Sequence, residues 1–344
     1  MTVSPLYVTS VGMVCPLGLR AETAYAAMRA GVKCFQESRY RDDNGEPIIC
    51  SELSLLPVDS THRERLLVLL GLAVADAARG VDQTELAHMP LLVGTSEPER
   101  PGCISDLHAE VIVRLQREKG LLLNASLSHG ISTGNTAGLR ALAEARSLLE
   151  RQPWVPGCFV AGVDSLVNAP AIWWLDENER LKRSDFPDGV IPGEAAACVL
   201  VTRKPRLRGS RLMAVLGLGF ARETALPQSE EPLRAHGLVQ ASRAALVEAG
   251  LSISGIDFRL SDAAGESHSF KEVSLALSRM LRVNKESMPL WLPAESLGET
   301  GAASGLTALV MASMAMDRGH APGTRAIAYT AAASGDRAVA VVGI

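Results

Sequence analysis

The sequence predicts an α/β protein made of two similar halves that pack as one body. Three observations lead to this expectation. The chain of 344 residues is too long for one small domain, and its hydrophobic fraction of 47% is enough for a large core. Short apolar runs alternate with amphipathic runs along the chain. After residues 203–210 the order of strand, turn and helix begins again, so we expect an internal duplication with halves 1–205 and 206–344.

In the first half, apolar runs bounded by turn residues predict strands, and longer amphipathic or small-residue runs predict helices. The first strand ends in the turn CPLG at 15–18. Residues 33–60 are polar and contain the turn signal DDNG, so we expect irregular structure there. The expected strands are 6–13, 91–94, 158–163 and 196–201, and the expected helices are 20–29, 62–78, 104–118 and 134–149.

The second half follows the same pattern after a junction that is too short to be a flexible linker. Its first strand resembles that of the first half in length and composition, and a helix rich in small residues precedes the last two strands. The expected strands are 212–220, 258–261, 326–330 and 338–342, and the expected helices are 231–249, 270–282 and 301–316.

Composition excludes several classes of function. A net charge of −4 with 21% charged residues argues against a disordered or nucleic-acid-binding chain, and 4% aromatic residues are few for a stacking platform. The six cysteines form no CxxC pair and no ligand set with histidine, so we expect no metal. Gly217 and Gly219 lack the third glycine of a dinucleotide site, and we expect no cofactor. The start of the chain lacks the pattern of a signal peptide and no apolar run reaches ~18 residues, so we expect no membrane span and a cytoplasmic location.

Four segments stand in a characteristic order along the chain. They are YVTSVGMVCPLG at 7–18, AGVD at 161–164, DGVIPGEAA at 188–196 and GETGAASG at 298–305. In this order they resemble the β-ketoacyl (3-oxoacyl-ACP) synthases of the thiolase superfamily. The resemblance implies a thiolase-like fold, in which two duplicated α/β halves form a layered αβαβα sandwich, and it implies dimers that act on acyl thioesters. Residues 95–133 are compact where the family is longer, so the family's acyl tunnel and dimer contacts carry over less firmly.

The same resemblance indicates where catalytic groups would lie. The family uses one Cys as nucleophile and two His to hold an enolate, with a Lys nearby. The Cys position falls on Asn135, the two His positions on Ala264 and Glu299, and the Lys position on Ala294. The family's gating Phe is missing from residues 332–337.

Each replacement removes the chemistry of condensation. An amide cannot attack a thioester, alanine has no donor, and a carboxylate repels an enolate unless burial keeps it protonated. Structural roles are the simpler expectation: Asn135 as the N-cap of the helix 136–149, Glu299 as an acid at a helix N-terminus, and His268 as a surface residue.

Two hypotheses follow from the sequence. In the first, the protein is catalytically inactive in condensation and acts by binding. Its partner would be a thiolase-fold protein in a homodimer or heterodimer, an acyl carrier protein or CoA thioester, or a bacterial secretion-cluster protein. This hypothesis predicts a pocket filled by side chains and an apolar patch elsewhere.

In the second hypothesis, the protein is an acyltransferase or thioesterase-like enzyme with a relocated nucleophile. Ser132, Thr133 or Thr136 would attack the thioester, with Glu299 or His268 as base. This alternative predicts that one of these hydroxyls lies within hydrogen-bond reach of Glu299 or His268.

Overall fold

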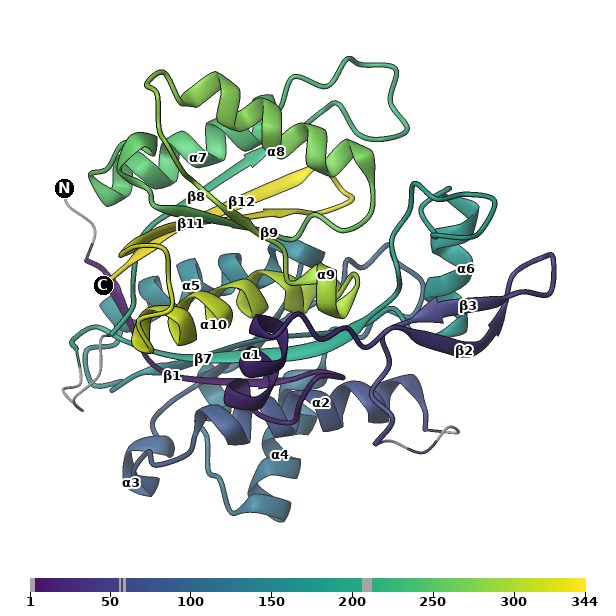
Figure 1. Cartoon of the computed structure of the whole chain (residues 1–344). Coiled ribbons are helices and arrows are strands. Elements are labelled where there is room, and N and C mark those ends of the chain that lie inside the picture. Colours follow the sequence, from purple (N-terminus) through teal and green to yellow (C-terminus); the bar gives the residue numbers. More distant parts are fainter. Residues whose placement is uncertain (1–3, 56, 58–59, 206–211) are drawn as a thin grey trace.

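The computed structural model describes residues 4–55, 57, 60–205 and 212–344, and it has five alternating layers of helices and strands (Figure 1). This architecture confirms the expected αβαβα sandwich. The expected boundary between the halves, after residue 205, adjoins 206–211, which lie outside the described residues.

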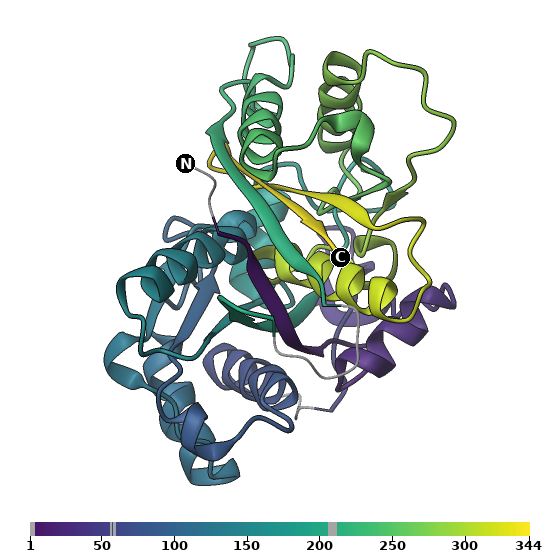
Figure 2. The ribbon, with the colours of Figure 1, turned by 90° about the vertical axis from the view of Figure 1, so that its left-hand side faces the viewer.

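The two strand layers belong to one ten-stranded sheet, of order β10-β9-β11-β12-β8-β1-β7-β6-β4-β5. The layers join where Leu6 of β1 pairs with Val215 of β8, and Figure 2 shows these two strands side by side. One layer consists of β1 (Leu6–Val14), β7 (Glu194–Thr202), β6 (Cys158–Ser165), β4 (Leu91–Thr95) and β5 (His129–Ser132). The other consists of β8 (Ala214–Arg222), β12 (Asp336–Gly343), β11 (Arg325–Ala331), β9 (Phe258–Ser261) and β10 (Leu290–Trp291).

Helices cover both faces of each strand layer. The middle layer holds α5 (Ala137–Arg151) and α10 (Ser304–Asp317), one from each half. Because α10 lies between the two strand layers, nearly all of its residues are buried. Strands β6 and β7 are likewise buried along their whole length. The outer layers hold α2 (His62–Ala77), α3 (Gln83–Leu86) and α4 (Leu107–Lys119) on one side, and α7 (His236–Ala249) and α8 (Ser267–Met280) on the other. Three further helices flank the layers: α1 (Ala21–Arg29), α6 (Ala169–Glu177) and α9 (Ala294–Leu297).

Within 33–60, the expectation of irregular structure is wrong for residues 36–50. This segment contains a hairpin of β2 (Gln36–Arg41) and β3 (Pro47–Cys50), and the predicted turn DDNG connects the two strands. The hairpin forms because Ile48 and Cys50 point into a small apolar cluster with α6, while alternate residues face solvent.

Two helices of the second half start at other residues than expected. The helix expected from 231 begins at His236, because Ala235 has a left-handed backbone (φ 53°) that cannot lie inside a helix. The helix expected from 270 begins at Ser267, which places His268 in its first turn.

Candidate functional site

The N-termini of the two middle helices meet at one point. Each is preceded by a short 3₁₀ turn, Gly134–Thr136 before α5 and Gly301–Ala303 before α10, and the two turns contact each other. Both turns open on a glycine with positive φ, 57° at Gly134 and 50° at Gly301. A Cβ at Gly134 would lie 2.1 Å from the carboxylate of Glu97, so glycine is required for the close approach of this side chain.

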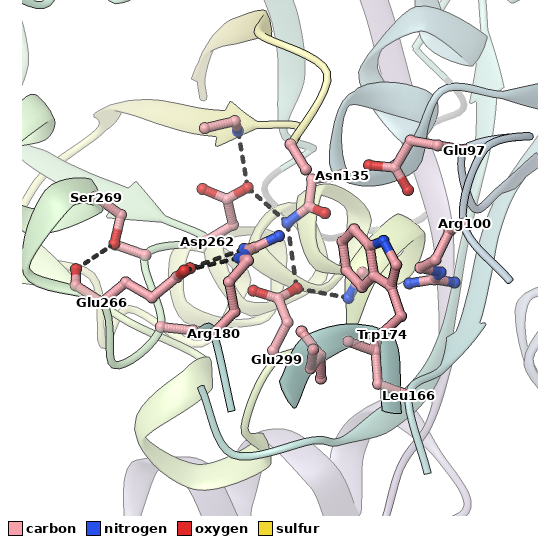
Figure 3. A pocket seen from close by; sticks show the side chains of 16 residues that line it. Glu97, Arg100, Asn135, Leu166, Trp174, Arg180, Asp262, Glu266, Ser269 and Glu299 are labelled. Carbon is pink, nitrogen blue, oxygen red and sulfur yellow. Dashed lines mark hydrogen bonds and ion pairs between the residues drawn. The ribbon is translucent and has the colours of Figure 1, made fainter. Parts of the chain in front are cut away.

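The side chain of Asn135 bridges two carboxylates at this point (Figure 3). Its Nδ2 donates to Asp262 Oδ2 at 3.0 Å and to Glu299 Oε1 at 3.2 Å. Asp262 follows directly after β9, and its Oδ2 also accepts from Ala331 N at 2.8 Å. Glu299 Oε1 accepts from Gly301 N at 2.7 Å. Two segments of the second half, at Asp262 and Glu299, therefore converge on one amide group of the first half.

Burial perturbs both carboxyls. It raises the pKa of Glu299 to about 7, and the neighbouring charge of Asp262 adds to this rise. Burial also raises the pKa of Asp262 to about 6, although the hydrogen bonds from Ala331 N–H and Asn135 oppose the rise. At neutral pH the pair therefore carries at least one negative charge.

Two arginines line the same cavity, and each already has a carboxylate partner. Arg180 forms a two-pronged ion pair with Glu266, at 2.7 and 2.8 Å. Arg100 pairs with the buried Asp164. Within the described ranges, neither Asp262 nor Glu299 takes part in an ion pair, so their charge is balanced only by hydrogen bonds and by more distant cations.

The cavity itself is small. It has a volume of about 50 Å³ and lies between Trp174, the arginines and the carboxylates. A neighbouring hollow of about 160 Å³ shares Trp174 and Arg180 with it and reaches Leu226 and Ala332. Both are below the ~300 Å³ at which pockets for drug-sized ligands usually begin.

The structure brings together some of the residues expected from the sequence. Asn135 and Glu299 are in contact, but the third polar group beside them is Asp262 and not a group at Ala264. Ala264 lies two residues further along and only lines the cavity. Asp262 could have been found from its position directly after a strand. Strands β9 and β11 are parallel, so residues that follow them lie at the same edge of the sheet.

The expected capping role of Asn135 is wrong. The N-cap position of α5 is Thr136, and no side chain caps this helix. The amide of Asn135 is instead committed to the two carboxylates. Glu299 does accept a hydrogen bond from Gly301 N–H ahead of α10, as an acid at a helix N-terminus would.

The hydroxyls of the alternative hypothesis have other environments. Ser132 Oγ bonds Thr95 Oγ1 at 2.8 Å, and Thr136 Oγ1 donates to Thr133 O at 2.9 Å. The hydroxyl of Thr133 is buried and has no hydrogen-bond partner in the described part of the chain.

The second base of that hypothesis is also engaged elsewhere. His268 Nε2 lies 3.1 Å from Ala225 O. Among the described residues, none of the three hydroxyls bonds to Glu299 or to His268, so the arrangement expected of a relocated nucleophile is not present.

Other features bear on the class of site. No group of three or more His, Cys, Asp or Glu within 4–55, 57, 60–205 and 212–344 is arranged to hold a metal ion. None of the helices in these ranges has the length and apolar character needed to cross a membrane. The most exposed large apolar side chains, Val113, Trp173 and Val247, lie on three different helices, so they do not by themselves mark one apolar patch.

Comparisons with known proteins identify the fold. No family model and no curated protein matches the chain. Solved structures match it over nearly its whole length. One matching chain comes from the complex of the ketosynthase ApeO with its chain length factor ApeC from Xenorhabdus doucetiae. The match has a TM-score of 0.77 at 18% identity and covers 99% of this chain and 98% of that one.

Two further solved structures agree. The ishigamide ketosynthase/chain length factor matches with a TM-score of 0.78 at 18% identity, covering 99% of both chains. A β-ketoacyl synthase from Burkholderia phymatum matches with a TM-score of 0.72 at 17% identity, also covering 99% of both. The layered arrangement of helices and strands is therefore that of the thiolase-like fold that ketosynthases have.

Proposed function

We propose that this protein is a ketosynthase-like subunit that does not catalyse condensation and that acts by binding a second thiolase-fold protein. The observation that carries this proposal is the position and bonding of Asn135. This residue stands in the turn between β5 and α5, at the helix N-terminus where the resembling family has its Cys, and its amide is held by two carboxylates.

The chemistry of these three side chains supports inactivity in condensation. The amide nitrogen of Asn135 has a delocalised lone pair and is not a nucleophile. Decarboxylative condensation develops negative charge on an enolate oxygen, which an active site stabilises with donors. Here Asp262 and Glu299 present carboxyls instead. At ~4 Å and an effective dielectric constant of about 20, a carboxylate opposes such a charge by about 4 kcal/mol, or roughly a thousandfold in rate.

The small cavity supports the same proposal. Trp174, Arg180 and Glu266 occupy the space beside Asn135 and leave about 50 Å³. An acyl chain at Asn135 would have to displace the Arg180–Glu266 ion pair, both of whose side chains are largely buried.

Binding to a second subunit is supported by the edge of the sheet. The ten-stranded order ends at β5, which pairs with β4 and has no strand on its other side among the described residues. Such an edge offers unpaired backbone groups to another strand. The matched chain from Xenorhabdus doucetiae belongs to a complex of a ketosynthase with its chain length factor. We propose that this chain pairs in a similar way, with a second copy or with a different thiolase-fold subunit.

The first experiment is a search for acyl transfer by mass spectrometry. The purified protein is incubated with malonyl-CoA, decanoyl-CoA and the corresponding acyl carrier protein forms, and both the intact protein mass and the remaining thioester are measured. We expect no adduct and no consumption. An adduct that disappears in Ser132→Ala, Thr133→Val or Thr136→Val would contradict the proposal and establish the acyltransferase alternative.

A second experiment tests the partner. Sedimentation velocity is measured for the chain alone and after co-expression with ketosynthases of its own genome. We expect a complex of two thiolase-fold chains in one of these samples, with slower hydrogen exchange of the β5 amides than in the free chain. A monomer in every sample, or a complex without protection of β5, would contradict the proposed interface.

A further inference from the structure

A separate groove lies on the far side of the loop that follows Asp262. It has a volume of about 430 Å³ and shares only Ala263 and Ala264 with the cavity beside Asn135. Its lining is mostly apolar. The side chains that form it include Phe35, Ile191, Ala264, Phe270, Leu292 and Ala294.

The shape of this groove is fixed by backbone contacts. A Cβ at Gly265 would lie 2.2 Å from Gly189 O, and a Cβ at Gly298 would lie 2.4 Å from Ile191 O. Three loops from different parts of the chain therefore touch main chain to main chain. Because backbone atoms form these contacts, rotation of a side chain cannot move the three loops apart or together, and the backbone part of the groove exists before any ligand arrives.

The charged groups of the groove are two lysines and one glutamate. Lys33 is exposed, and Lys182 Nζ donates to Pro187 O at 2.8 Å. Neither lysine forms an ion pair in the described part of the chain, and both line the same groove as the exposed Glu295. The charged side chains of the groove therefore sum to a net charge of +1 beside an apolar wall.

From this combination we infer that the groove binds an amphipathic anion, namely a linear aliphatic carboxylate. The hydrocarbon chain lies against Phe35, Phe270 and Leu292, where its burial is favourable at about 25 cal/mol per Å². The carboxylate lies at Lys33 and Lys182, whose ammonium groups supply charge-assisted donors. This site is distinct from the Asn135 site and goes beyond the proposed function.

Isothermal titration with decanoate, below its micellar concentration, tests the inference. Decanol and decyltrimethylammonium have the same chain with a neutral or a cationic head. We expect decanoate to bind at least tenfold more tightly than either. The double variant Lys33→Ala/Lys182→Ala should weaken decanoate at least tenfold and leave decanol unchanged, whereas Lys119→Ala, which removes a lysine at the end of α4, should change neither.

Filling the groove provides an independent test. Ala294→Phe should abolish binding of decanoate and decanol alike, and circular dichroism checks that this variant is folded. Phe35→Glu, at a partly exposed loop position, is a second variant that places a negative charge on the apolar wall and should also abolish decanoate binding.

Three results would overturn the inference. They are no binding of decanoate at millimolar concentration, equal or tighter binding of the cationic amphipath, and binding that persists in both Ala294→Phe and Phe35→Glu. Decanoyl-CoA is titrated in parallel. Binding of the free acid without the CoA thioester identifies a carboxylate site, whereas a preference for the thioester would contradict the assignment of the carboxylate to the lysines.

Discussion

Replacing Glu299 by glutamine should stabilise the protein above neutral pH. The Glu299 carboxyl is buried, and its pKa is raised from an ordinary value of 4.5 to about 7. The folded state therefore holds its proton to higher pH than the unfolded state does. Between pH 4.5 and 7 the unfolded state binds fewer protons, so the free energy of unfolding falls as pH rises.

The magnitude follows from the pKa. At about 1.4 kcal/mol for each pKa unit, full ionisation of Glu299 lowers the free energy of unfolding by about 3 kcal/mol. Glutamine keeps an oxygen that can accept from Gly301 N–H and from Asn135, but it has no proton to lose. We expect Glu299→Gln to match the parent protein within about 0.5 kcal/mol at pH 4.5 and to exceed it by about 2–3 kcal/mol at pH 8.

Urea unfolding at pH 4.5, 6, 7 and 8 measures this difference. The control is Glu295→Gln, a change at an exposed residue four positions earlier, which should leave the pH dependence intact. If Glu299→Gln is less stable than the parent at pH 8, the folded protein stabilises the charged carboxylate. If both lose stability equally between pH 4.5 and 7, folding does not raise the pKa of Glu299. Either result refutes the reasoning.

Three further predictions concern the same region and the buried ion pairs. Asn135→Cys should place a thiol between two carboxyls, which keep the pKa of the thiol high. Its labelling by iodoacetamide, measured as intact protein mass, should therefore be no faster than that of free cysteine. The variant should also catalyse no condensation. Gly134→Ala should lower the free energy of unfolding in urea by about 2 kcal/mol, because its φ is positive and its Cβ would collide with a carboxylate. Glu194→Gln should cost about 3 kcal/mol in the same assay by leaving the buried Arg65 without its main partner, whereas Glu110→Gln, which breaks an exposed ion pair, should cost under about 1 kcal/mol.

The architecture could be predicted because its signals are local and repeated. Strands such as β6 and β7 are buried on both faces and appear in the sequence as unbroken apolar runs. The short strand β5 was missed, since only Ile131 of its four residues is buried and no run of apolar residues marks it. The hairpin at 36–50 was missed for a related reason: its polar face dominates the composition.

The candidate site could be predicted only in part. The positions of Asn135 and Glu299 could be predicted because each residue lies close to the start of a helix that the sequence indicates. Asp262 was missed because the sequence of a loop does not show which of its side chains point the same way. Asp262 lies two positions before Ala264, and only the end of β9 shows which of the two faces Asn135. The bridging role of the Asn135 amide depends on residues 127 and 164 positions away, which no local pattern reveals.

The packing of α5 against α10 in the middle layer determines how the protein unfolds. Because α5 of the first half packs against α10 of the second, and β1 joins β8, the two halves share one core. Neither half can open without exposing the apolar face of the other. The protein should therefore unfold in a single cooperative transition, and a protease that cuts between the halves should yield a nicked but associated molecule rather than two separate domains.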